Sequence, residues 1–190
     1  MKDIVKLMCI PFFVLLFMVM FDTDAQAKEP GMTDILVTNN EESVLFYARL
    51  VNGFKEEMEK AIHAGVPAEF IMKLHVYEQR SYIWDKKINS KVIVRTISYD
   101  NLKKTFSIYS NDKKEPAVFN EFQSAKSAMA DFNGIVAMPI AALEKGKTYY
   151  LKAKVIMDKV RLPLGMESIS FFVSLWDYDT KWHTKEFILK

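Results

Sequence analysis

Alternating apolar and polar residues are the dominant pattern of the chain from residue 34 onwards. The clearest case is segment 68–80, in which Phe70, Met72, Leu74 and Val76 alternate with other residues. A period of two predicts a β-strand, because successive side chains lie on opposite faces of the sheet. The other expected strands are two runs within 34–51, then 91–100, 102–110, 134–140, 148–160, 168–176 and 181–189.

Two segments change to helical spacing. After Asn52, which is the expected N-cap, apolar residues recur three and four positions apart and predict a helix of about eleven residues before Gly65. A second helix is expected over 121–131, with Asn120 as its N-cap and Gln123 at the reciprocal position of a capping box. Both helices are short insertions between strands.

The order of these elements predicts the fold class. Many short strands with only two lone helices leave too few crossovers for a parallel α/β sheet, so antiparallel sheets packed face to face are favoured. We therefore expect a mainly β protein, an immunoglobulin-like β-sandwich with two short helical insertions. This expectation rests on the number of strands, because the cysteine-tryptophan-cysteine signature of immunoglobulin domains is absent.

The first 27 residues differ from the rest of the chain. Lysines precede an unbroken apolar run of 15 residues, 7–21, and the segment ends in Ala25-Gln26-Ala27. This pattern predicts a secretory signal peptide, 1–27, whose helix is cleaved off, because a spanning helix needs roughly 17–25 apolar residues. An uncleaved amino-terminal anchor, 4–21, in the inner membrane is the alternative.

Both interpretations export the remainder of the chain, with 28–33 as a polar lead-in and 34–190 as a single β-sandwich domain. The only cysteine, Cys9, lies in the apolar run, so the exported part has no disulfide. The positive start and the absence of organelle signals favour the periplasm of a bacterial envelope. The net charge of +2 is too small for a nucleic-acid-binding protein, which needs a clustered basic face.

The sequence contains no recognisable catalytic, metal-binding or cofactor-binding motif. Its three histidines, His63, His75 and His183, form no zinc-ligand spacing, and neither a nucleophile elbow nor a phosphate-binding glycine loop occurs. We therefore expect a protein that is not an enzyme and holds no cofactor. A hydrolase with a dispersed site is a further alternative, and it would need a histidine beside a carboxylate in the folded chain.

Aromatic residues at predicted connections are the candidate contacts with a ligand or partner: Tyr82, Trp84, Trp176 and Trp182. An exposed indole or phenol brings a large apolar area with one polar group, which suits stacking on sugars or anchoring a protein. The competing interpretation is that these rings cover the ends of the core. Lysine pairs such as Lys86-Lys87 are read as solvated strand ends that could attract an anionic membrane surface weakly.

Several segments carry a family resemblance: GVPAEFIMKLHVYEQR, YIWDKKI, SYDNLKKTFSIYS, AALEKGKTYYLKAKV and RLPLGMESISFFVSLWD. In this order they resemble the bacterial envelope family known as domain of unknown function 4390, over nearly the whole region 34–190. The resemblance implies a small exported domain without an assigned activity or catalytic residues.

Three functions are carried forward. The first is a periplasmic, non-enzymatic module that binds an envelope protein through a strand edge or an aromatic anchor. The second is a carbohydrate- or lipid-binding domain that uses exposed tryptophans, and the third is the hydrolase.

Overall fold

The computed structural model describes residues 29–158 and 178–189. The predicted signal peptide, and the strand expected at 168–176 with Trp176, lie outside these residues. The described elements are β1 (Gly31–Asn39), β2 (Ser43–Val51), α2 (Glu56–His63), β3 (Ala68–Glu78), β4 (Lys86–Asp100), β5 (Thr105–Ser110), β6 (Ala117–Phe119), α3 (Phe122–Ala130), β7 (Asp131–Pro139), the 3-10 helix η2 (Ile140–Ala142), β8 (Thr148–Asp158), β9 (Tyr178–Asp179) and β10 (His183–Ile188).

The strands form two antiparallel sheets. The small sheet has the order β1-β2-β7, and the large sheet has the order β10-β8-β3-β4-β5-β6, with β9 beside β8. Every strand pair in the described part of the chain is antiparallel. The prediction of a mainly β protein with antiparallel sheets and two short helices is therefore confirmed.

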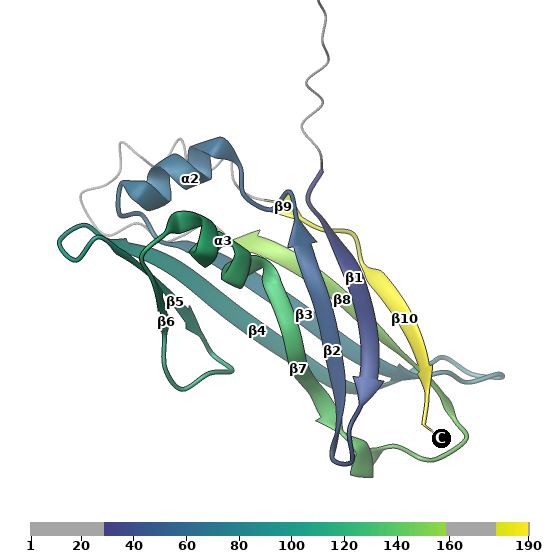
Figure 1. Cartoon of the computed structure of the whole chain (residues 1–190). Coiled ribbons are helices and arrows are strands. Elements are labelled where there is room, and N and C mark those ends of the chain that lie inside the picture. The colour runs from purple at the N-terminus through teal and green to yellow at the C-terminus, as the bar shows by residue number, and fades with distance from the viewer. Residues whose placement is uncertain (1–28, 159–177, 190) are drawn as a thin grey trace, which may run out of the picture.

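The small sheet covers one half of the large sheet (Figure 1). On one side β1 lies alongside β10, and on the other side β7 lies alongside β4. Two side chains of β4 join the sheets at the second contact: Asn89 Nδ2 donates to the carbonyl of Ala137 at 2.6 Å, and Lys91 Nζ donates to that of Val136 at 2.8 Å. The carbonyls at this edge of β7 thus accept hydrogen bonds from side chains of β4, although β7 pairs with no strand of the large sheet.

The core lies between the sheets and beneath the helices. The apolar positions of β3 predicted to face inward, from Phe70 to Val76, are all buried, and so is the alternating set of β8 from Tyr149 to Met157. Burial of one such large side chain contributes about 1.5–3 kcal/mol. Helix α2 adds Met58 and Ile62 to the same core, and α3 adds its own buried face over the half of the large sheet that the small sheet leaves uncovered.

Both predicted N-caps are wrong. Helix α2 begins after Lys55, and Asn52 lies outside it with a φ of 55° while its side chain donates to the carbonyl of Glu29 at 3.3 Å. The next residue, Gly53, also lies outside the helix, and its carbonyl accepts a 2.7 Å hydrogen bond from the Tyr178 hydroxyl. The N-cap position of α3 is Glu121 rather than Asn120, and the Glu121 side chain makes no capping hydrogen bond.

Three local predictions also differ from the structure. The expected strand 102–110 begins only at Thr105, and Leu102 is 95% exposed in the β4–β5 turn. The expected helix 121–131 gives way directly to β7, which starts at Asp131 and contains Gly134 at a φ of 66°. The connection between the expected strands 168–176 and 181–189 includes the short strand β9, which pairs with β8.

Candidate functional site

The outer face of the large sheet carries a row of aromatic and basic side chains. Its strands turn their apolar residues inward, so the alternate residues of β3 and β8 face away from the core. The register of the two strands places Tyr77 opposite Tyr150 and His75 opposite Lys152. We call this row the aromatic–lysine strip, and it consists of His75, Tyr77, Tyr150, Lys152, Lys154 and Trp182.

The rings of the strip contact one another in sequence. Tyr77 and Tyr150 stack with their centroids 5.1 Å apart and their planes 9° from parallel. His75 lies 6.3 Å from Tyr77 and 4.9 Å from Trp182, so four rings form one continuous series. Such ring pairs add about 0.5–1.5 kcal/mol beyond the area that they bury. The series is thus a rigid, partly exposed surface.

The two lysines lie against these rings. Lys152 Nζ is 5.6 Å from the Tyr77 centroid and 5.5 Å from that of Tyr150, and Lys154 Nζ is 5.3 Å from the Trp182 ring. These distances fall in the range of cation–π attraction. Lys154 also forms a 2.5 Å ion pair with Asp179, which lowers the pKa of that carboxyl.

Burial and the surrounding lysines affect the pKa of the histidine in the strip. Burial lowers the pKa of His75, and the positive charges of Lys87, Lys73 and Lys152 lower it further. Because the ordinary pKa of histidine is already about 6.5, the His75 ring is neutral at pH 7. The positive charge of the strip at that pH therefore comes from its lysines.

A groove of about 810 Å³ adjoins the Trp182 end of the strip. Lys154, Asp179 and Trp182 form one wall, and residues 29–31 and 180–183 complete the lining. Trp182 is 42% exposed, so its ring belongs to both the groove and the strip. The strip and the groove form one continuous surface of rings and charges.

The other end of the strip continues into the β3–β4 loop. Tyr150 donates a 2.7 Å hydrogen bond to Asp85, whose other carboxylate oxygen accepts from the backbone N–H of Arg80. These bonds lower the pKa of Asp85, whereas burial and the bond to Asp85 raise the pKa of Tyr150 to about 12. Tyr82 and Trp84, whose rings are exposed, lie in the sequence between Arg80 and Asp85.

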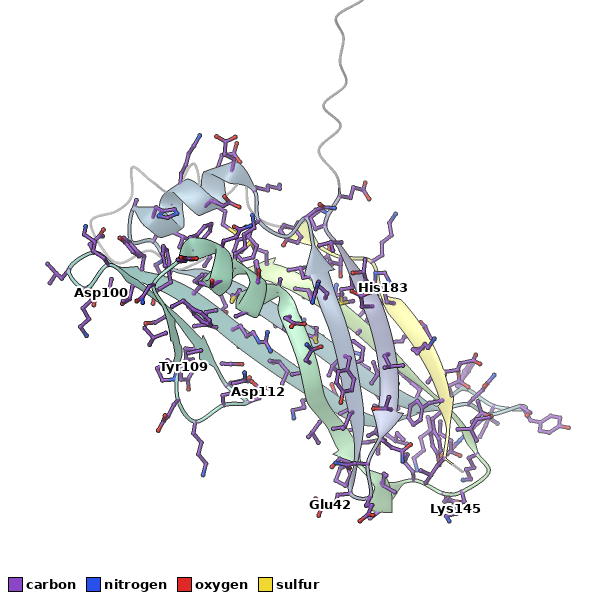
Figure 2. The ribbon with its side chains drawn as sticks, viewed as in Figure 1. Glu42, Asp100, Tyr109, Asp112, Lys145 and His183 are labelled. Atoms are coloured by element: carbon purple, nitrogen blue, oxygen red, sulfur yellow. The ribbon has the colours of Figure 1, made fainter. Side chains whose placement is uncertain are left out.

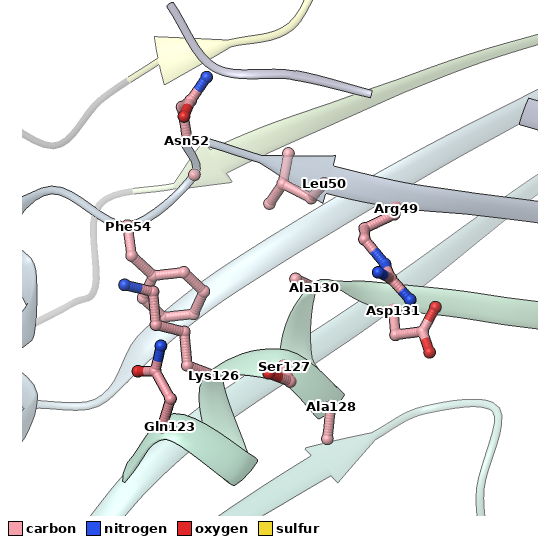
Figure 3. Close-up of a pocket in the computed structure, with 11 residues that line it drawn as sticks. Arg49, Leu50, Asn52, Phe54, Gln123, Lys126, Ser127, Ala128, Ala130 and Asp131 are labelled. Carbon is pink, nitrogen blue, oxygen red and sulfur yellow. The ribbon is translucent and has the colours of Figure 1, made fainter. Parts of the chain in front are cut away.

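A second cavity, of about 580 Å³, lies between the end of β2 and helix α3 (Figure 3). Arg49, Gln123, Lys126 and Asp131 line it, and Phe54 forms part of its wall. Lys126, on α3, forms an ion pair with Glu59 on α2. Because basic and acidic side chains line the same cavity, it favours no single class of ligand.

The predicted contact residues are thus divided between two places. Tyr82 and Trp84 lie together on the β3–β4 loop, Trp182 lies at the far end of the strip, and Trp176 is outside the described residues. Sequence reasoning missed the residues that connect them: His75 is considered there only as a metal ligand or catalytic base, and Tyr77 and Tyr150 are not among the predicted contacts. These residues occupy the outward positions of the alternating segments, and they can be recognised as neighbours only once the register between β3 and β8 is known.

The histidines are dispersed. His63, at the end of α2, packs against the rings of Tyr99, Phe106 and Phe122, and His183 begins β10. Among residues 29–158 and 178–189, no histidine nitrogen is paired with a carboxylate within 4.0 Å. The same residues contain no group of three potential metal ligands from histidine, cysteine, aspartate and glutamate.

Comparison with known proteins gives one match. A family model described as "Domain of unknown function (DUF4390)" matches residues 27–186, which span both sheets and the whole strip. The chain belongs to this family. The resemblance seen in the sequence is therefore confirmed, and DUF4390 brings no assigned activity to the strip. No curated protein and no solved structure matches the chain.

Proposed function

We propose that the protein is an exported, non-enzymatic binding module of the bacterial envelope, and that the aromatic–lysine strip holds a protein partner in the periplasm. The leader pattern in 1–27, or an anchor formed by 4–21, supports the location. Among the described residues, no helix combines the length and the apolar character that a membrane span requires.

The observation that carries the proposal is the difference between the buried and the outward faces of β3 and β8. Their inward residues build the core, whereas their outward residues carry three contacting rings and two lysines, and Trp182, just before β10, adds the fourth ring. Tyrosine, tryptophan and cationic side chains dominate the binding energy of many interfaces, since they combine large area with polar groups. The lysines favour a partner whose contact surface is acidic.

The scaffold suits this role. Two antiparallel sheets that share one core hold the strip in a fixed geometry. The immunoglobulin-like form of the sandwich stays a proposal that rests on the strand count and on these two layers.

Capture from envelope extract tests the function. The wild-type protein should retain a stoichiometric partner that is released at high salt, whereas Trp182→Ser should lose most of it. Tyr109→Ser is the matched control, because Tyr109 is an exposed ring on the same sheet face but on β5, away from the strip. Equal recovery by the wild type and both variants would count against the strip as the binding surface.

Carbohydrate binding is the second candidate, and the groove beside Trp182 favours it. A half-exposed indole at the wall of an open groove can stack on a sugar ring while charged neighbours bind its substituents. Titration of tryptophan fluorescence with cell-wall fragments, in the wild type and in Trp182→Phe, distinguishes this candidate. An emission spectrum that no fragment changes would eliminate it.

A further inference from the structure

Three consecutive large apolar residues project from the β3–β4 loop. Tyr82 is 98% exposed, Ile83 65% and Trp84 77%. We call these three residues the β3–β4 tip. In Figure 1 the loop extends past the ends of the neighbouring strands β8 and β10. A contiguous exposed apolar group of this kind marks an interaction site rather than ordinary surface.

The base of the loop is held firmly. Asp85 bridges Arg80 and Tyr150 through its two carboxylate oxygens, and the N–H of Gln79 donates to the carbonyl of Thr148 at 3.0 Å. These contacts fix both ends of the loop against β8. The two ends of the loop are therefore held in place while the tip projects into solvent, and among the described residues no hydrogen bond, ion pair or ring contact holds the tip against the sheet.

Basic side chains surround this base. Asp85 follows the tip, and the next two residues are Lys86 and Lys87, which are exposed and within residues 29–158 and 178–189 have no carboxylate in ion-pair range. The β7–β8 turn brings Lys145 and Lys147 to the same end of the molecule, where Lys147 is paired with Glu78. Around the tip the basic side chains of Arg80, the two lysines after Asp85 and the two lysines of the turn thus outnumber the carboxylates of Glu78, Asp85 and Glu144.

We propose that the β3–β4 tip inserts into the interfacial region of an anionic lipid bilayer. Tryptophan and tyrosine are the residues that favour this depth, because their rings are apolar and their N–H and O–H groups remain hydrated. Lys86 and Lys87 lie where the phosphates of the headgroups would be, and each contributes about 1 kcal/mol at an anionic surface.

The shape of the tip favours lipid over a protein partner. A bilayer accepts a convex, isolated group without a matching cavity, whereas a protein partner must supply a groove of complementary shape. The insertion does not depend on the strip, because the tip lies beyond the end of the sheet that carries it. A membrane-bound tip would leave the strip free to hold its own partner.

A spin label at the tip tests the proposal in the full chain. The only cysteine is Cys9, so Cys9→Ser combined with Ile83→Cys gives a single labelling site. The matched control is Leu102→Cys, which is 95% exposed and is likewise followed by two lysines. Its turn lies beyond Asp100, at the opposite end of the molecule from Lys145 (Figure 2).

Labelled proteins are mixed with phosphatidylcholine vesicles with and without phosphatidylglycerol. The label at position 83 should become inaccessible to an aqueous relaxation agent only when phosphatidylglycerol is present, and the label at 102 should stay accessible. The apolar run 7–21 is the same in both proteins, so it cannot produce a difference between the labels. Circular dichroism checks that both variants are folded.

Charge variants give the second measurement. Lys86→Ser combined with Lys87→Ser should reduce insertion of the labelled tip roughly tenfold or more at equal lipid concentration. Lys113→Ser with Lys114→Ser removes the same charge from the β5–β6 loop and should have no effect. In the Ile83→Cys background, Trp84→Ser should reduce insertion as well, because the indole is the largest apolar group of the tip.

Specific results overturn the proposal. It is wrong if the label at 83 stays aqueous with both vesicles, if both labels are immersed, or if phosphatidylglycerol makes no difference. Loss of a captured envelope protein from Trp84→Ser, together with an aqueous label at 83, would identify the tip as a protein contact instead. Failure of the Trp182→Ser capture test would refute the proposed function and leave the membrane result unchanged.

Discussion

Replacing Arg95 with methionine is expected to destabilise the protein by about 2–3 kcal/mol. Arg95 is only 3% exposed and lies on the inner face of β4. Its Nη1 donates to the carbonyls of Ala128 at 3.1 Å, Met129 at 3.3 Å and Asp131 at 2.8 Å, and its guanidinium lies 4.2 Å from the ring centroid of Phe132. The side chain therefore satisfies carbonyls where α3 passes into β7.

The magnitude follows from two opposing effects. One Nη1 carries two hydrogens, so the three contacts amount to two full hydrogen bonds, each worth about 1.5–3 kcal/mol for a charged donor. Against this gain stands the cost of burying the guanidinium, which also lowers the pKa of Arg95. Methionine avoids that cost but leaves the carbonyls unpaired. A net loss of about 2–3 kcal/mol remains.

Urea unfolding provides the assay. Arg95→Met should lower the midpoint without changing the slope, and hydrogen exchange should accelerate first in α3, whose carboxyl end loses its donors. Arg95→Lys is the companion variant, because it keeps the charge but replaces the planar donor group by a compact ammonium. A methionine variant as stable as the wild type would show that desolvation cancels the hydrogen bonds, and the reasoning would fail.

Three further predictions concern single groups. In the folded protein the pKa of His75 is lowered, so the free energy of unfolding of the wild type should decrease as pH falls below about 6.5. His75→Gln should show a smaller decrease over this pH range, and an equal decrease in both proteins would contradict the prediction. Tyr150→Phe should raise the pKa of Asp85 toward its ordinary value in an NMR titration, and an unchanged pKa would mean that the hydrogen bond is absent in solution. Gly53→Ala should cost about 1–3 kcal/mol in thermal unfolding, because the added methyl would overlap a neighbouring buried leucine, whereas Gly31→Ala, with space around it, should cost much less.

The sequence was most informative where one strand determines its own burial. The alternation around Phe70 and Leu151 correctly predicts which residues of β3 and β8 face the core, because a period of two does not depend on the partner strand. Leu102 was placed wrongly because the alternation was continued through a turn. The turn ends at Lys104, whose φ of 57° breaks the pleat before β5 begins.

The candidate site was harder to predict because it depends on register. His75 and Lys152 become neighbours only when β3 and β8 pair, and nothing within either segment specifies that pairing. Trp84 and Trp182 were identified because large aromatic residues in connections are conspicuous by themselves. The same limit explains why the N-cap predicted at Asn52 is wrong, since Tyr178, far along the chain, donates a hydrogen bond to the carbonyl of the next residue, Gly53.

The position of β10 has a consequence for the order in which the protein folds. Residues 183–188 supply the strand that pairs with β8, and the buried Thr180 exchanges hydrogen bonds with Val155. Until these residues have paired, one border of β8 keeps unpaired amides and carbonyls to which a strand of another chain could bind. A folding intermediate in which β10 is still detached should therefore be the species most prone to aggregate.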